Sequence, residues 1–167
     1  KLPEKGFVFA CFNNSYKISP AEFDIWMSLL KKVDNSFLWL YATNEKSKEN
    51  LLKEASLRQI ESSQIIFAEK MPLKKHFDRH CSADLFLDTF PYNAQATASD
   101  AIWSGLPVLT CMGTSFSSRV AASLLNAIGL DELITNNHEK YMEVAIKLGN
   151  NPKQLKRIKS KIDIILS

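Results

Sequence analysis

The sequence predicts an α/β fold, a doubly wound parallel sheet of five to six strands with helices on both faces. Apolar runs of strand length alternate with helix-like segments over all 167 residues, and this alternation is typical of parallel sheets joined by crossover helices. Several runs are continuously apolar, as expected of strands covered on both faces. The length suits one ordinary domain. We therefore expect a single domain over residues 1–167 and, because the first residue is Lys1, we expect it to be part of a longer chain.

The composition narrows the classes of protein to consider. With 46% hydrophobic and 23% charged residues, the chain is expected to be globular. A net charge of +3 is too small to indicate a nucleic-acid partner. The three cysteines are far apart and lack Cys-x-x-Cys spacing, which favours a reducing, cytoplasmic location. No apolar run approaches the roughly 20 residues of a membrane span, and no cluster of His, Cys, Asp or Glu has the spacing of a metal site.

The first third of the chain predicts two strands and two helices. A strand at 7–12 and a polar loop precede residues 19–22, Ser-Pro-Ala-Glu, which combine a capping box with proline at the first helical position. The helix that begins there has an apolar face of Phe23, Trp26, Leu29, Leu30 and Val33. A second strand is expected at 37–41. The charged helix that begins near Asn44 carries Leu51, Leu52, Ala55 and Leu57.

The rest of the chain continues the alternation. A short helix is expected within 71–80, another begins near Ala96, and a third spans 115–129, where a glycine ends it. The remaining strands are expected at 64–67, 84–88, 107–111 and 132–135. Two helices close the chain, at 138–148 and from Pro152 onward. The last one turns Leu155, Ile158 and Ile162 inward, and its basic residues form its solvated side.

The loop between the fourth strand and the helix near Ala96 is the candidate ligand site. In an open parallel sheet, ligands bind at the carboxyl ends of the strands, where the next helix presents unpaired N–H groups. Small residues allow a backbone to approach a diphosphate here, and Thr97 adds a hydroxyl; the same residues equally suit a helix N-terminus without a ligand. Asp100 suits ribose hydroxyls or a favourable first-turn charge. Lys17 lies in a loop that should reach the same edge of the sheet, where its ammonium either faces phosphate or is simply solvated.

Other common sites are missing from the sequence. There is no Gly-x-Gly-x-x-Gly after a strand and no Gly-x-x-x-x-Gly-Lys-Ser/Thr. His76 and Arg79 are three residues apart on one helix face, so both side chains can face the same groove. No Ser-His-Asp or Cys-His arrangement can be assembled with them.

Several segments in order along the chain form a more specific pattern. They include Phe-Asn-Asn-Ser-Tyr-Lys-Ile-Ser-Pro at 12–20, Leu-Asp-Thr at 87–89, Trp-Ser-Gly at 103–105 and Ser-Arg-Val-Ala-Ala-Ser at 118–123. Together they resemble the C-terminal catalytic half of O-GlcNAc transferases, most closely their bacterial tetratricopeptide-repeat homologues. The resemblance implies a GT-B glycosyltransferase of two Rossmann-like halves, of which this chain is the C-terminal, UDP-GlcNAc-binding half. It also implies inverting transfer to protein Ser or Thr hydroxyls, without a metal or other cofactor.

The resemblance implies roles for ten residues. Lys17 would be the catalytic, diphosphate-binding lysine, with Asn14 beside it at a glutamine position of the family. The backbone of Met71 would contact uracil, the ring of His76 would stack on it, and Arg79 would lie nearby. The remaining members of the proposed UDP-sugar site are Tyr92, Gln95, Ala96, Thr97 and Asp100.

The chain departs from the family pattern in the loop before the helix near Ala96. The family grips the diphosphate with His-Thr-Thr, of which only the second Thr remains, as Thr97, whereas Gln95 and Ala96 replace the others. Gln95 can still donate through its amide and Ala96 through its N–H. Tyr92 replaces a smaller residue near the N-acetyl group of the sugar, and Asp100 keeps the position of the ribose-binding aspartate. The sugar is therefore GlcNAc or a related one.

The implied partners are a UDP-sugar, a protein acceptor, the N-terminal GT-B half and tetratricopeptide repeats in the parent chain. The other half would supply the general base, so this chain alone should be inactive. The alternative is a non-catalytic nucleotide-binding or interaction module whose active site has degenerated at Gln95 and Ala96.

Overall fold

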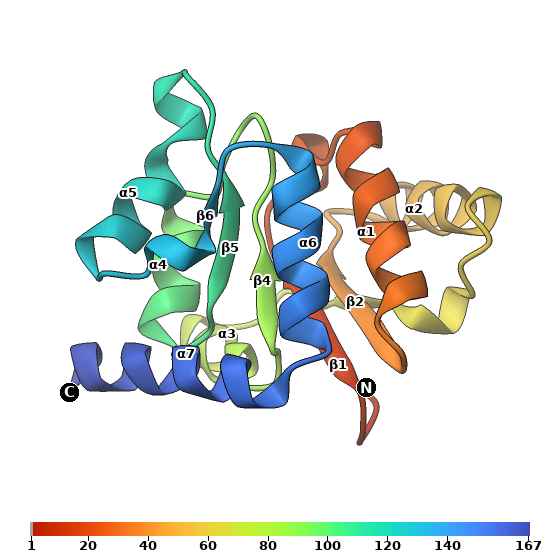
Figure 1. The fold of residues 1–167 in the computed structure, drawn as a ribbon. Coiled ribbons are helices and arrows are strands. Elements are labelled where there is room, and N and C mark those ends of the chain that lie inside the picture. The colour runs from red at the N-terminus through yellow and green to blue at the C-terminus, as the bar shows by residue number, and fades with distance from the viewer. Residues whose placement is uncertain (1) are drawn as a thin grey trace.

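A computed structural model describes residues 2–167 and contains one six-stranded sheet in which all strands are parallel. The strand order is β3-β2-β1-β4-β5-β6 (Figure 1). The strands are β1 (Phe7–Cys11), β2 (Ser36–Tyr41), β3 (Ile65–Ala68), β4 (Leu85–Leu87), β5 (Val108–Cys111) and β6 (Ile134–Thr135). The order reverses between β1 and β4, which is the switch point where doubly wound sheets bind ligands. The predicted Rossmann-like sheet is confirmed.

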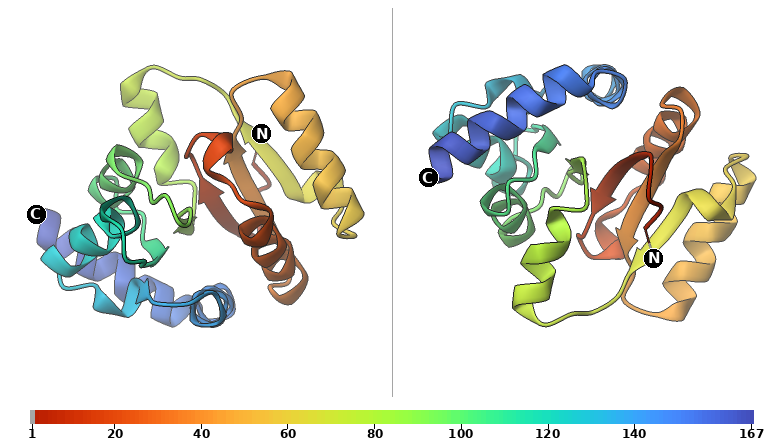
Figure 2. Two further views of the ribbon diagram at one scale, coloured as in Figure 1. Left: turned by 90° about the horizontal axis from the view of Figure 1, so that it is seen from above. Right: turned by 90° about the horizontal axis from the view of Figure 1, so that it is seen from below.

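Helices cover both faces of this sheet. They are α1 (Pro20–Lys32), α2 (Glu45–Leu57), α3 (Leu73–His80), α4 (Ala96–Trp103), α5 (Val120–Ala127), α6 (His138–Gly149) and α7 (Pro152–Leu166). α1 and α6 pack side by side on one face, and α3 and α4 lie on the other (Figures 1 and 2). α7 crosses the amino ends of the strands (Figure 1). The carboxyl ends of the strands are therefore free of α7.

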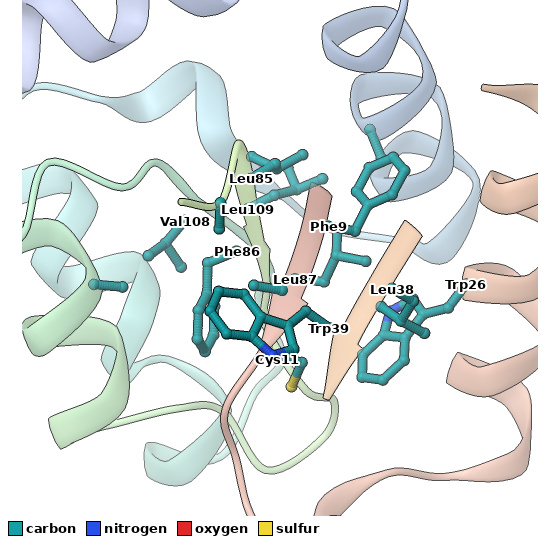
Figure 3. Close-up of a cluster of buried hydrophobic side chains, with 14 of the residues drawn as sticks. Phe9, Cys11, Trp26, Leu38, Trp39, Leu85, Phe86, Leu87, Val108 and Leu109 are labelled. Carbon is teal, nitrogen blue, oxygen red and sulfur yellow. The ribbon is translucent and has the colours of Figure 1, made fainter. Parts of the chain in front are cut away.

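The core lies between the sheet and its helices (Figure 3). Phe9, Phe86 and Leu109 on three neighbouring strands are fully buried, as expected of strands covered on both faces. Trp26 of α1 is also buried, and its indole Nε1 donates a hydrogen bond to the hydroxyl of Tyr141 of α6, 3.4 Å away. This packing makes the centre of the sheet a rigid platform for the loops at its carboxyl edge.

One detail of the predicted elements was wrong. The helix expected over 115–129 is interrupted at Arg119 and begins as a separate 3₁₀ turn. The hydroxyl of Ser118 bonds the backbone N–H and C=O of Ser115, and such local bonds compete with helix formation. Gly129 ends this segment at a φ of 65°, as predicted.

The last helix has the predicted amphipathic character. Leu155, Ile158 and Ile162 are buried. Lys159 pairs with Asp84 at 3.3 Å, and Lys161 and Arg157 both approach Glu132, so much of its basic side is used within the domain. Within residues 2–167, none of the helices combines the length and apolar character that a membrane span requires.

Candidate functional site

The loops that follow β1 and β4 lie against each other at the switch point of the sheet. The ammonium group of Lys17, on the first loop, donates to the backbone oxygen of Asn93 on the second, 3.2 Å away. It also lies 3.9 Å from the centre of the Tyr92 ring, a cation–π contact. The fold thus brings together Lys17 and the loop before α4, which are far apart in the sequence.

A groove of about 400 Å³ opens beside these loops, between the end of β1 and α3. Its volume is in the range of small-molecule sites. It is lined by Phe12, Asn14, Tyr41, Lys70, Met71, Leu73, His76, Arg79 and Thr97. Five residues of the proposed site therefore share one groove, whereas Lys17, Tyr92, Gln95, Ala96 and Asp100 lie outside its lining.

His76 is held as a neutral, oriented ring. A guanidinium can only donate, so the contact between Arg79 Nη2 and His76 Nδ1 makes Nδ1 the acceptor and leaves the proton on Nε2. That Nε2 lies 3.8 Å from the Asp100 carboxylate. Burial, and then the charge of Arg79, lower the pKa of His76. At neutral pH the ring presents an uncharged aromatic face to the groove, and His76 and Asp100 lie side by side.

Arg79 and His80 fix the helix that carries His76. Arg79 Nη1 donates to the backbone oxygen of Glu69 at 2.8 Å, and its guanidinium lies 4.5 Å from the centre of the Phe12 ring. His80 is fully buried, and its ring packs edge-on against Phe12. Burial lowers the pKa of His80 to about 4, so His80 is a neutral core residue under the groove.

The first turn of α4 faces the same edge. Gln95 precedes the helix and its side chain makes no capping hydrogen bond, so first-turn N–H groups of α4 are available to an anion. The Thr97 hydroxyl donates to the side-chain oxygen of Asn13 at 2.5 Å. Asn13 is buried, and its amide donates in turn to the Thr89 hydroxyl at 2.7 Å. Thr97 is therefore oriented by a network that sequence reasoning missed.

Asp88 was also missed, although it organises the loop after β4. One oxygen of its fully buried carboxylate accepts the N–H groups of Thr89 and Ala94 at 2.8 and 2.6 Å, and the other accepts the Thr110 hydroxyl at 2.6 Å. Burial raises the pKa of Asp88 to about 7. An acidic residue that ends a continuous apolar strand was the signal in the sequence. Its carboxylate closes residues 89–94 into a compact turn below Lys17.

Metal-binding groups do not gather at this edge. In the part of the chain that the structure describes, no three His, Cys, Asp or Glu side chains lie close enough together to hold a metal ion. The ammonium and the backbone N–H groups at the site are suited to an organic anion, whereas the carboxylate is suited to hydroxyl donors and the neutral imidazole to an aromatic ring.

A solved glycosyltransferase domain has a similar fold. The catalytic domain of a cholesterol-α-glucosyltransferase from Helicobacter pylori has the same fold at 16% identity, with a TM-score of 0.62 over 96% of this chain and 98% of that one. The two domains therefore share a Rossmann-like fold built on a parallel sheet.

The chain belongs to glycosyl transferase family 41, whose model matches residues 1–165. It is 34% identical, over 97% of its length, to a UDP-N-acetylglucosamine–peptide N-acetylglucosaminyltransferase from Caenorhabditis elegans. A mutant O-GlcNAc transferase from Thermobaculum terrenum is 30% identical and superposes on 99% of the chain with a TM-score of 0.92. The chain spans only 14% of the first relative and 32% of the second. The resemblance predicted from the sequence is confirmed.

Proposed function

We propose that this domain binds the UDP-sugar donor of an inverting glycosyltransferase that moves GlcNAc, or a related sugar, to Ser or Thr hydroxyls of proteins. Family membership and the names of the relatives support this activity. The observation that carries the proposal is the position of Lys17, whose ammonium lies on the loop leading into α4. A cation beside a helix N-terminus is suited to a diphosphate.

The groove beside α3 would hold the nucleoside. His76 offers a neutral ring for stacking on uracil, and Arg79 keeps that ring in place. The backbone at Met71, on the rim of the groove, would contact the base. Asp100 lies beside His76 and would accept hydrogen bonds from the ribose hydroxyls.

The diphosphate would lie over the first turn of α4. Lys17, the N–H groups of Ala96 and Thr97, and the amide of Gln95 would stabilise the negative charge that grows on UDP as the glycosidic bond breaks. Asn14 would act from the neighbouring loop. Tyr92, next to Lys17, would face the sugar. Catalysis by this half would then be stabilisation of the leaving group.

The rest of the machinery would come from the parent chain. We propose that an N-terminal GT-B half supplies the general base and that tetratricopeptide repeats contact the protein acceptor, in a bacterial, cytoplasmic enzyme. We further propose that the reaction needs no metal, because the cations that meet the diphosphate would come from the protein. The present domain would then bind the donor and have no activity alone.

Replacement of Lys17 tests the proposal. Because the leaving-group charge exists mainly in the transition state, Lys17→Ala in the parent enzyme should lower kcat by about 100- to 1,000-fold and weaken UDP binding much less. Steady-state kinetics and calorimetry measure the two effects. Lys53→Ala, on the exposed side of α2, is the matched control and should change neither. Equal losses in turnover and UDP affinity would refute the catalytic role of Lys17.

A non-catalytic nucleotide-binding or interaction module is the second candidate. It is favoured by Gln95 and Ala96 at the start of α4, and by the contacts that already occupy the ammonium of Lys17. Calorimetry with UDP and UDP-GlcNAc separates a donor site from an interaction module, and sugar transfer by the parent enzyme separates it from a non-catalytic nucleotide-binding module. Binding that His76→Ala and Asp100→Ala abolish supports the donor site, whereas no binding of either ligand supports an interaction module.

A further inference from the structure

Glu22 has a place in the fold that its role as a helix cap does not explain. It lies in the first turn of α1, where one carboxylate oxygen accepts the N–H of Ser19 at 3.0 Å and the Ser19 hydroxyl at 3.1 Å. These bonds complete a capping box. A capping box does not require burial, yet only 3% of Glu22 is exposed.

The second oxygen of Glu22 makes a bond to a distant segment. It accepts the backbone N–H of Phe90, 68 residues further along the chain. Phe90 lies in the turn of residues 89–94 that the Asp88 carboxylate closes. Burial raises the pKa of Glu22 to about 7, which shows that the position disfavours the charged form. The three accepted hydrogen bonds offset this cost in part.

Lys17 is attached to both of the segments that Glu22 joins. Its main chain lies two residues before Ser19, where Glu22 bonds the backbone. Its ammonium contacts Tyr92 and Asn93, which follow Phe90 in the turn. The link from Ser19 through Glu22 to Phe90 therefore sets the distance between two parts of the protein. One is the backbone of Lys17, and the other is the turn that its ammonium contacts.

We propose that Glu22 is a positioning residue that sets the place of the Lys17 ammonium by tying Ser19 to the turn at Phe90. The inference rests on the proposed function only where the effect of that placement on sugar transfer is concerned. The placement itself can be measured without a substrate.

NMR of the chain with ¹³C-labelled lysine tests the placement. The ammonium of Lys17 lies over the Tyr92 ring, 3.9 Å from its centre. The proton resonance of the methylene bonded to this ammonium should therefore be shifted upfield and should disappear in Lys17→Arg, which assigns it. Glu22→Met removes both links without opening a cavity. Glu22→Gln keeps the bond to Phe90 through its amide oxygen but loses the bond from the Ser19 N–H, because its NH₂ group cannot accept and can only donate to the Ser19 hydroxyl. The upfield shift should be largely lost in Glu22→Met and reduced in Glu22→Gln. Asn151→Ala, which removes a cap of α7, should leave it unchanged.

Kinetics of the parent enzyme test the consequence for the reaction. Glu22→Met should lower kcat by about 10- to 100-fold, as expected when a reacting geometry is displaced. It should cause no further loss in a Lys17→Ala background, because residues that act through one group are not additive. An unchanged Lys17 resonance in Glu22→Met would overturn the proposal. So would a loss of kcat on adding Glu22→Met to Lys17→Ala that is as large as the loss in the wild type. A parent enzyme without transferase activity would count against the proposed function, and the NMR result would still decide the role of Glu22.

Discussion

Replacing Asp88 by Asn should stabilise the domain at alkaline pH, although three hydrogen bonds converge on its carboxylate. The amide oxygen of Asn can accept the N–H groups of Thr89 and Ala94. Its NH₂ can donate to the Thr110 hydroxyl, which rotates to accept. The substitution therefore keeps the network and removes the buried charge.

The size of the effect follows from the pKa of Asp88, which is about 7 in the fold against 3.8 for the unperturbed group. Between these values the folded protein holds a proton that the unfolded chain has lost, so stability falls as the pH rises from about 4 to 7. A difference of about 3 pKa units corresponds to about 4 kcal/mol. Asn does not titrate. Relative to the wild type, Asp88→Asn should gain about 3 kcal/mol of unfolding free energy between pH 4.5 and pH 8, because pH 4.5 already lies above the unperturbed pKa.

Urea unfolding of the wild type and Asp88→Asn at both pH values measures this change. His80 also titrates. Because its pKa is lowered to about 4, it stabilises the folded state as the pH rises from 4 to 6.5. This contribution is common to both proteins and cancels in the comparison. Asp34→Asn, at an exposed position, should show no such dependence. The reasoning would be refuted if the difference in unfolding free energy between the wild type and Asp88→Asn were the same at both pH values. It would also be refuted if Asp88→Asn were the less stable protein at pH 8.

Two further predictions concern packing and charge, and urea unfolding checks both. A Cβ on Gly149 would lie 2.7 Å from Cγ2 of Val33, which is buried, so Gly149→Ala should cost about 1–3 kcal/mol; a cost in the Val33→Ala background as large as in the wild type would contradict this explanation. Lys159 donates to the backbone oxygen of Ala83 and to Asp84, so Lys159→Ala should cost about 1 kcal/mol. Exposed Lys156 is its control, and equal effects of the two substitutions would mean that the Lys159 contacts add no stability.

The strands and most helices were predictable because their signals are local. A continuous apolar run marks each central strand, and the Ser19 and Glu22 pair marks the start of α1, where the structure has the capping box. The segment at 115–129 failed for a local reason as well, since Ser118 bonds the backbone of Ser115 instead of continuing a helix. Apolar periodicity does not report such side-chain competition.

The candidate site was predicted in part. The spacing of His76 and Arg79 placed both on one face of a short helix, and they do contact each other. Their shared groove, and the approach of Asp100 to His76, required α3 and α4 to pack together. Asp88 escaped the sequence analysis because a strand-end carboxylate gives no sign of the backbone groups that will surround it.

The sequence by itself determined the alternation of elements, the first turn of α1 and the pattern of glycosyl transferase family 41. These depend on neighbours in the chain or on residues in a fixed order. Only the tertiary structure decided that Lys17 rests on Tyr92 and Asn93, and that Glu22 bonds Phe90. The physical reason is the sheet order: β1 and β4 are distant in sequence but adjacent in space, so the loops at their carboxyl ends make contact only after the strands between β1 and β4 have been placed on the other side of β1.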